Sequence, residues 1–316
     1  MASGDGPVLV IGATGQQGGA TARELLQRGW AVHALVRDAG KPAATLLREA
    51  GARLVTCDLD DTASVRAAMS GVHGVFLVLT MMTGPRVTLD GVAAEERRGK
   101  AMADVAGQTG IRHLVYSSIS GADLHTGIPH LESKRRIEEH IQALALPATI
   151  LRPVSFMDNF TTYNRPVLAD GGLVVSLALR PETRLPMIAT RDIGAFAAIA
   201  FGQPRRFLGQ RIEIAGDDLT GPQIAETFGR ACGLPARYQQ VPTEQLRAFD
   251  EEVAKMFEWL DGRGAGGPDL AALRALHPGL MTLQTWLRET GWNPGSPSGD
   301  PSSARTATAR PAGARS

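Results

Sequence analysis

The chain has 316 residues, 43% of them hydrophobic, and its 33 basic and 32 acidic side chains leave a formal net charge of +1. This balance argues against the strongly basic surface that nucleic acids or anionic membranes attract, so we expect direct binding of neither. Two cysteines, an N-terminus unlike a signal peptide, and no apolar run near the ~18 residues of a membrane span predict a cytoplasmic protein without a disulfide framework.

The first half of the chain alternates strand-like and helix-like segments. Short apolar runs predict strands at 7–13, 31–38, 52–59, 72–80, 111–118 and 147–153. Helical patterns fill the intervals at 15–29, 41–51, 62–71, 93–110 and 131–145, with Thr62 suited to an N-cap. Continuously apolar strands separated by helices indicate an α/β fold with a doubly wound parallel sheet of the Rossmann type.

The second half is less regular and predicts a smaller C-terminal α/β subdomain. Strand-like runs at 171–178 and 210–216 accompany helical material at 190–204, 220–262 (with a short strand inside it) and 282–292. We expect a nucleotide-binding domain over 1–153 with parts of 186–216, and a smaller subdomain over 154–185 and 217–292. The Pro-, Ser-, Gly- and Arg-rich residues 293–316 have little to bury and predict a disordered tail.

The stretch "IGATGQQGG" lies between the first strand and the first helix and predicts a dinucleotide site. Glycines at 12, 15 and 18 suit a tight turn, close approach of a pyrophosphate and packing of helix on strand. The helix N-terminus would present free N–H groups to the phosphates. The expected contacts are Gly12, Thr14, Gly15, Gln16, Gln17 and Gly18; the alternative is a merely flexible turn.

The end of the second strand predicts which dinucleotide binds. Arg37 can pair bidentately with a ribose 2′-phosphate and Lys41 can add a second positive charge, which favours NADP(H) over NAD(H). A solvated Arg–Asp loop is the alternative, in which Asp38 serves the free ribose of NAD.

Two further strand ends offer contacts to the cofactor. Asp58 and Leu59 follow the third strand, where a carboxylate can accept from the adenine amine while the leucine packs on the ring. The acids of "TCDLDD" can instead cap the helix near Thr62. Thr80 ends the fourth strand and is expected beside the central part of the cofactor.

With these pieces placed, the chain resembles the NmrA-like branch of the atypical short-chain dehydrogenase/reductases. The matching stretches run from about residue 8 to 292 and include "VIGATGQQGG", "RHLVYSS", "HLESKRRIEEH", "ILRPVSFMDNF" and "TLQTWLRETGW". The resemblance implies a Rossmann domain and a smaller subdomain with a cleft between them. It implies either catalysis or regulation, since relatives include NADP-sensing regulators, quinone reductases and isoflavone-reductase-like enzymes.

An ordinary enzyme of this superfamily uses a tyrosine as proton donor and a lysine one helical turn later. The residues four places after the three tyrosines are Ser120, Val167 and Pro242, so this chain has no such pair. His130 and Lys134 take the two positions instead.

We expect Lys134 to hold the nicotinamide ribose, and the resemblance to isoflavone-reductase-like enzymes lets it act as acid or base. Its alternative is a surface charge beside Glu138. The ordinary pKa of histidine, near 6.5, would let His130 donate a proton, although a cap or a packing residue is the alternative.

Further candidates lie at the ends of the fifth and sixth strands. Ser117 and Ser118 sit where the superfamily keeps a substrate-orienting hydroxyl, or they satisfy strand-end backbone groups. Pro153 and Phe156 are expected beside the cofactor, and Phe156, Asn159 and Tyr163 beside a substrate; core packing is the alternative for the aromatic residues. Met256, Phe257 and Trp259 are expected to line the cleft or to pack in the core.

These residues predict an NADPH-dependent reductase that transfers hydride to a small apolar acceptor such as a quinone or enone. The alternative is a non-catalytic sensor in which the cofactor changes the smaller subdomain or the loop 81–99, and a protein partner reads the change. We expect a monomer or homodimer and no metal site.

Overall fold

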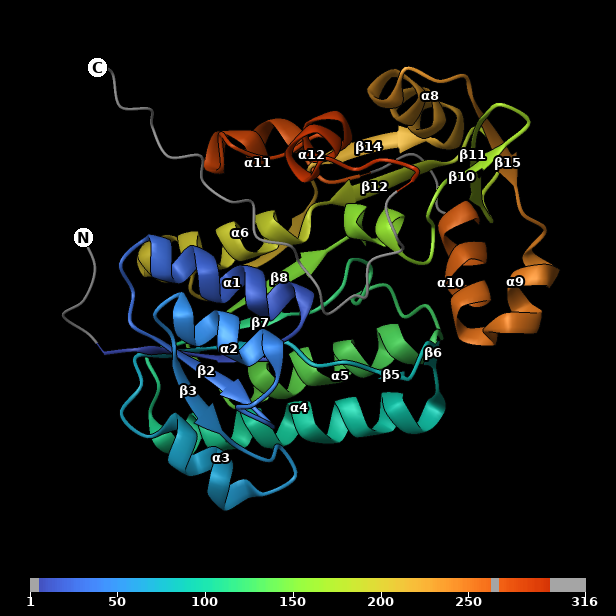
Figure 1. Cartoon of the computed structure of the whole chain (residues 1–316). Helices are drawn as coiled ribbons and strands as arrows, with labels where there is room; N and C mark the ends of the chain where they lie inside the picture. Colours follow the sequence, from blue (N-terminus) through green and yellow to red (C-terminus); the bar gives the residue numbers. More distant parts are fainter. Residues whose placement is uncertain (1–5, 263–266, 296–316) are drawn as a thin grey trace, which may run out of the picture.

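A seven-stranded parallel sheet forms the centre of the larger domain in this computed structural model, which describes residues 6–262 and 267–295 (Figure 1). Its spatial order is β3 (Arg53–Thr56), β2 (Val32–Val36), β1 (Val8–Ile11), β4 (Gly74–Leu77), β7 (His113–Ser117), β8 (Ala148–Pro153) and β13 (Arg211–Ile214). The strand order reverses between β1 and β4, where open α/β sheets bind their ligands. The predicted Rossmann-type fold is confirmed.

Helices cover both faces of this sheet (Figure 1). One face carries α1 (Gln16–Gln27), α2 (Pro42–Glu49) and α6 (Thr190–Gly202), and the other carries α3 (Thr62–Met69), α4 (Leu89–Thr109) and α5 (Pro129–Ala143). Alternate strand residues feed the two cores, as with Val8 and Leu9 of β1. Burial on both faces explains why the strands are continuously apolar.

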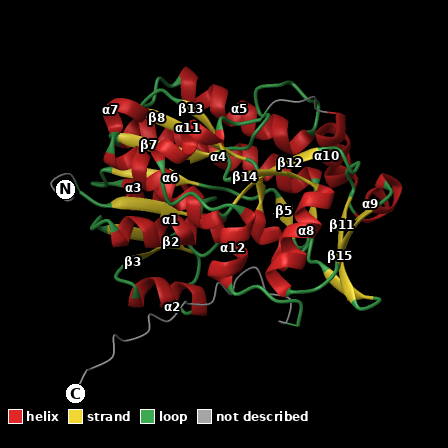
Figure 2. Cartoon of the chain, turned by 90° about the horizontal axis from the view of Figure 1, so that it is seen from above, coloured by secondary structure: helices red, strands yellow, loops and turns green. Residues whose placement is uncertain are grey.

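The smaller subdomain has its own core, which contains Phe160, Phe228 and Trp286. Its sheets join β10 (Val167–Ala169), β11 (Gly172–Leu177) and β15 (Ala236–Gln240), and β14 (Asp217–Thr220), β12 (Arg184–Ile188) and β9 (Ser155–Phe156). Its helices are η1 (Met157–Thr161), α8 (Gly221–Cys232), α9 (Thr243–Phe249), α10 (Glu251–Gly262) and α12 (Leu283–Thr290), whereas Leu273 of α11 (Leu270–Leu276) packs in the core of the larger domain. Figure 2 shows α9 and α10 beyond the ends of the main strands.

Several predicted boundaries were wrong. Asp61, not Thr62, caps α3, because its carboxylate accepts from Ala63 N at 3.0 Å. The segment predicted as a loop over 81–99 is a hairpin of β5 (Met82–Thr83) and β6 (Arg86–Val87), followed by the first turns of α4. Thr88 caps α4, which begins four residues before the predicted start.

The predicted tail falls mostly outside the described residues. Its first two residues belong to the fold, because Arg165 donates to the carbonyl oxygens of Asn293 at 3.1 Å and Pro294 at 3.2 Å. None of the helices in residues 6–262 and 267–295 combines the length and apolarity that a transmembrane span requires.

Replacing Gly194 by alanine is expected to lower the free energy of unfolding by about 2–3 kcal/mol through overpacking. A Cβ at Gly194 would lie 2.7–2.8 Å from backbone atoms of Ala20 and Thr21, where α6 crosses α1. Gly202→Ala is the matched control in the same helix, since nothing lies within 4 Å of its Cβ position. Urea unfolding of both variants tests this, and equal stability would contradict the close-packing argument.

Candidate functional site

The glycine loop leaves the N-terminus of α1 open to an anion. Gly12 has φ +80°, and a Cβ at Gly18 would lie 2.2 Å from the Gly12 carbonyl oxygen, so both positions require glycine. Gly15 caps α1 without a side-chain hydrogen bond, and the first turn has no acidic residue. The N–H groups and the positive end of the helix dipole therefore suit a pyrophosphate, as the sequence predicted.

Residues after β2 leave positive charge exposed at the expected 2′-phosphate position. Arg37 and Lys41 are both exposed. Asp38 has one carboxylate oxygen committed to the turn, because Oδ1 accepts from Gly40 N at 2.8 Å. The arrangement therefore leaves Asp38 less free to hold a ribose diol than the sequence alone implied.

The acids after β3 each have a structural contact. Asp58 Oδ1 accepts from Asp60 N at 3.0 Å, and Asp60 binds Arg98 of α4. Asp61 takes the capping role. Asp58 is exposed, while Leu59 packs beside the core under α3 and α4.

The end of β7 is joined directly to the glycine loop. Ser117 Oγ donates to Gln17 Oε1 at 2.6 Å, so a side chain of α1 reaches past β4 to the next strand. Thr80, three residues beyond β4, accepts from Met82 N at 3.1 Å and is exposed. The structure thus brings together Gln17 and Ser117, whereas Ser118 donates to Glu138 of α5.

Lys134 lies in a buried ion pair that the sequence analysis missed. Its Nζ is 2.8 Å from Glu95 Oε1 of α4, and the two side chains are 6% and 0% exposed. Ser133 Oγ donates to Glu95 Oε2 at 3.0 Å. The surface alternative for Lys134, a pair with Glu138, is therefore wrong. Glu95 escaped notice because it begins the charged run "EERR", whose other members are surface-like.

His130 is 1% exposed, and its Nδ1 has no hydrogen-bond partner in the described part of the chain. Its pKa is lowered to about 4, chiefly by burial and also by the charge of Lys134, while the charge of Asp250 opposes the shift. The imidazole is therefore neutral at neutral pH. The expectation that His130 titrates near 6.5 was wrong, because the sequence did not reveal its burial.

Acid is expected to destabilise the protein through His130 and His113, since burial also lowers the pKa of His113 to about 4. These two histidines bind a proton near pH 6.5 in the unfolded chain but only near pH 4 in the folded protein. The free energy of unfolding that they contribute is therefore fully present above pH 6.5 and is lost as the pH falls from 6.5 to 4. We expect about 2 kcal/mol per histidine between pH 7 and pH 5.

Urea unfolding at the two pH values tests this expectation. His130→Gln should reduce the pH-dependent loss, and the exposed His125→Asn should leave it unchanged. An unchanged slope in His130→Gln would contradict the assigned neutral state.

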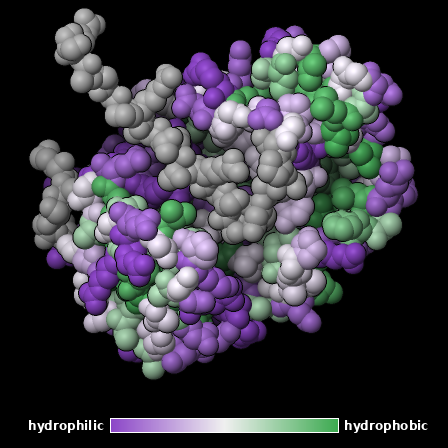
Figure 3. Space-filling view, in the orientation of Figure 1, coloured by the Kyte–Doolittle hydropathy of each residue, from purple (hydrophilic) through white to green (hydrophobic). Residues whose placement is uncertain are grey.

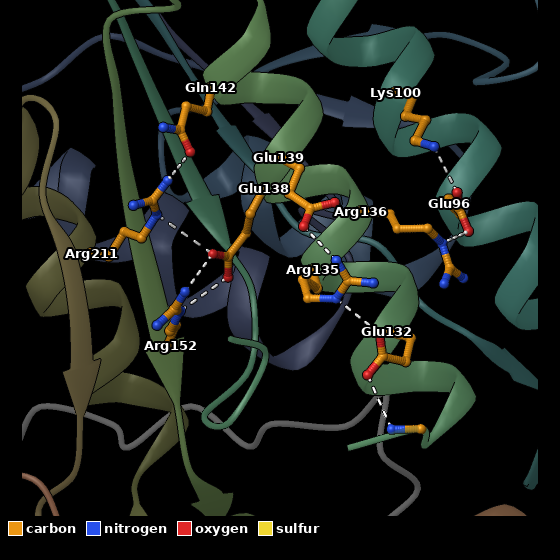
Figure 4. A network of polar contacts seen from close by, with 11 residues as sticks. Glu96, Lys100, Glu132, Arg135, Arg136, Glu138, Glu139, Gln142, Arg152 and Arg211 are labelled. Carbon is orange, nitrogen blue, oxygen red and sulfur yellow. Dashed lines mark hydrogen bonds and ion pairs between the residues drawn. The ribbon is translucent and has the colours of Figure 1, made fainter. Parts of the chain in front are cut away.

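A second network is centred on the buried Glu138 of α5 (Figure 4). Glu138 accepts from Arg152 Nη2 at 2.7 Å and Nε at 3.1 Å, and Arg211 lies 3.7 Å away. Arg152 also pairs with Asp123 of that loop at 2.7 Å. This network joins α5 to β8 and β13, and it fixes the chain between Ser117 and His130.

The segment after β8 serves packing as much as a site. Pro153 is buried, and Phe156 packs partly against the core beneath α1 and α6. Asn159 is half-buried, whereas Tyr163 is 60% exposed. Asp158, which the sequence analysis missed, accepts from Thr190 N at 2.8 Å and Oγ1 at 2.9 Å, and so fixes this segment on α6.

The smaller subdomain reaches over the N-terminal end of α5. Asp250, between α9 and α10, accepts from Val87 N of the hairpin at 2.9 Å. Trp259 of α10 packs so closely on Gly121 that a Cβ there would lie 2.5 Å from the indole. Met256 packs beside the subdomain core and Phe257 within it, which realises the packing alternative for these residues.

Apolar side chains also gather elsewhere on the smaller subdomain (Figure 3), where Val167 and Leu168 are more than half exposed. A surface pocket of about 550 Å³ is lined by Ala225, Arg230 and Tyr238 of this subdomain, among others. None of the predicted site residues lines this pocket. It is therefore separate from the glycine loop.

A family model described as the NmrA-like family matches residues 4–287. An NmrA-like family domain-containing protein of Dictyostelium discoideum is 27% identical, covering 81% of this chain and 88% of that protein. The Neurospora crassa nitrogen metabolite repression protein nmr is 32% identical, and the aligned part covers 48% of this chain and 33% of that protein. The Aspergillus campestris oxidoreductase cpsB is 29% identical, covering 87% and 83%.

Solved structures share the fold. NmrA, a negative transcriptional regulator in complex with NADP, has a TM-score of 0.75 at 23% identity, covering 90% of this chain and 95% of that one. The Escherichia coli NADPH-dependent quinone oxidoreductase QOR2, complexed with NADPH, has a TM-score of 0.73 at 20% identity, covering 89% and 99%. Proteins of this shape thus include both a regulator and a reductase.

Proposed function

We propose that this chain, which belongs to the NmrA-like family, binds NADP(H) at the C-terminal edge of its parallel sheet and reduces a small apolar acceptor of the quinone or enone type. The observation that carries the proposal is the N-terminus of α1, which has no side-chain cap, together with the exposed Arg37 and Lys41 that follow the neighbouring strand β2. The relatives named oxidoreductases and the quinone oxidoreductase of similar fold support the reaction class.

The proposal assigns each part of the dinucleotide to residues at this edge. The pyrophosphate binds the glycine loop, at Gly12, Thr14, Gly15, Gln16, Gln17 and Gly18. The 2′-phosphate binds Arg37 and Lys41, and the adenine lies on Asp58 and Leu59. The nicotinamide half is held by Thr80, Ser117, Lys134, Pro153 and Phe156. Residues 1–153 with parts of 186–216 bind the cofactor. Residues 154–185 and 217–292, with Asn159 and Tyr163, bind the acceptor.

Bound NADPH supplies the hydride. Lys134 holds the ribose with a charged donor, and neutral His130 donates or accepts a hydrogen bond without delivering a proton at neutral pH. A substrate that needs a strong acid at its carbonyl is therefore disfavoured. A quinone suits the site because its reduced oxygens take protons from water.

The alternative is an NAD(P)(H)-sensing regulator that acts through a protein partner. The contact between Asp250 and the hairpin favours it, because a cofactor that displaces residues 82–87 would also move α9 and α10. Arg86 lies 5.0 Å over the ring of Phe249, which is 49% exposed, so the same movement would change an exposed surface. The nitrogen metabolite repression protein among the relatives supports this reading.

NADPH oxidation by the purified protein, measured with a panel of quinones, enones and aldehydes, separates the two functions. We expect turnover with quinones well above the background rate and little with aldehydes, because His130 is neutral. NADPH binding measured on the same sample distinguishes the outcomes. Tight binding without turnover on any acceptor would replace the reductase by the sensor.

The compartment and the assembly are also proposals. Cys57 is buried and Cys232 half-buried, and both are free, which agrees with a reducing compartment such as the cytoplasm. We propose a monomer or a homodimer.

A further inference from the structure

We propose that Glu95 is a positioning residue that keeps the amine of Lys134 charged and directed toward the bound dinucleotide. This inference rests on the proposed binding of NADP(H) by Lys134. Glu95 lies on α4 and Lys134 lies on α5. Their charged atoms are 2.8 Å apart, and both side chains are buried.

Burial makes the charge of Lys134 depend on its partner. A buried amine favours its neutral form unless an opposite charge lies nearby, and Glu95 provides that charge. Ser133 occupies the second carboxylate oxygen at 3.0 Å, so the carboxylate is held in one orientation. Among the described residues Lys134 Nζ donates only to Glu95, so its two other N–H groups can serve a ribose hydroxyl, which a charged donor binds more strongly than a neutral one.

Other ionisable groups around this pair do not supply the charge. Glu138 forms an ion pair with Arg152, whose positive charge balances that of the carboxylate. His130 is neutral because its pKa is about 4. Burial raises the pKa of Tyr116 well above 10, so this side chain is uncharged as well. Asp250, at the α9–α10 junction, acts on His130, and its carboxylate accepts from Val87 N at 2.9 Å and from Glu252 N and Val253 N at 3.1 Å.

The test is the dissociation constant of NADPH measured from pH 6.5 to pH 9 in wild type and Glu95→Gln. Glutamine keeps the shape and one acceptor but removes the charge. We expect nearly constant affinity in wild type over the range in which the dinucleotide keeps its charge, whereas Glu95→Gln should lose on the order of tenfold as Lys134 gives up its proton. Glu95→Asp keeps the charge on a shorter side chain, so it should bind NADPH more weakly than wild type but gain no new pH dependence.

Glu96→Gln is the matched control. Glu96 is the next residue of α4, and it also bridges to α5, through Arg136 at 2.7 Å, while Lys100 lies at 2.7 Å on its other oxygen (Figure 4). Removing this partly exposed bridge should leave the pH profile of NADPH binding unchanged. A purely structural role for Glu95 predicts equal profiles for the two variants.

The outcomes separate the inference from the proposed function. If wild type does not bind NADPH, the proposed function fails. If wild type binds and folded Glu95→Gln follows the wild-type profile, only the role of Glu95 is overturned. If the Glu95→Gln protein does not fold, Glu95→Asp replaces it in the test. Its shorter carboxylate is expected to weaken NADPH binding at every pH without a new pH dependence. Unaltered NADPH affinity in Glu95→Asp would overturn the inference.

Discussion

Lys134→Met is expected to lose both stability and cofactor binding. Methionine fills a similar volume but leaves the Glu95 carboxylate buried without its counter-charge, which costs about 3–5 kcal/mol of the free energy of unfolding. The lost charged hydrogen bond to the ribose should weaken NADPH binding by roughly tenfold to a hundredfold. Urea unfolding and NADPH titration measure the two effects on one sample.

The double variant Lys134→Met with Glu95→Gln separates these effects. It removes both buried charges, so most of the lost stability should return. NADPH binding and turnover should stay weak, because the charged donor is still absent. Recovery of binding together with stability would show that Lys134 serves only the fold, as a link between α4 and α5.

Arg37→Ala is expected to change the choice of cofactor. A bidentate pair with the 2′-phosphate contributes enough for an effect of roughly a hundredfold on NADPH affinity, while NADH, which lacks that phosphate, should bind nearly as before. Arg48→Ala is the control, since Arg48 is an exposed arginine at the other end of α2. Titration of each variant with both dinucleotides measures the ratio.

Equal losses for NADPH and NADH in Arg37→Ala would contradict the assigned 2′-phosphate contact. An unchanged ratio would favour the alternative in which Asp38 holds a free ribose. The turn contact of Asp38 with Gly40 N argues against that alternative, because it uses one oxygen of the carboxylate.

The fold followed from local patterns in the sequence. Strands such as β1 and β7 are apolar throughout because the sheet is covered on both faces, and this pattern distinguishes them from helices. The glycine loop could also be predicted from the sequence, since Gly12 and Gly18 occupy positions where only glycine fits. Boundaries were less certain, as the capping of α3 by Asp61 shows, because neighbouring residues can serve the same cap.

The buried contacts of the candidate site could not be predicted from the sequence. Glu95 lies 39 residues from Lys134, and Asp250 lies 163 residues from Val87, so no spacing rule connects them. The burial that lowers the pKa of His130 likewise depends on elements far along the chain. Local motifs therefore predicted the candidate site residues, whereas the buried contacts of those residues depend on the tertiary packing.

Single-turnover mixing of NADPH-loaded protein with a naphthoquinone tests the reductase most directly. The nicotinamide absorbance of the bound cofactor should fall in proportion to the protein present and much faster than that of free NADPH at the same quinone concentration. Bound NADPH that stays reduced at the solution rate, despite tight binding, would contradict hydride transfer and leave the protein a sensor of its cofactor.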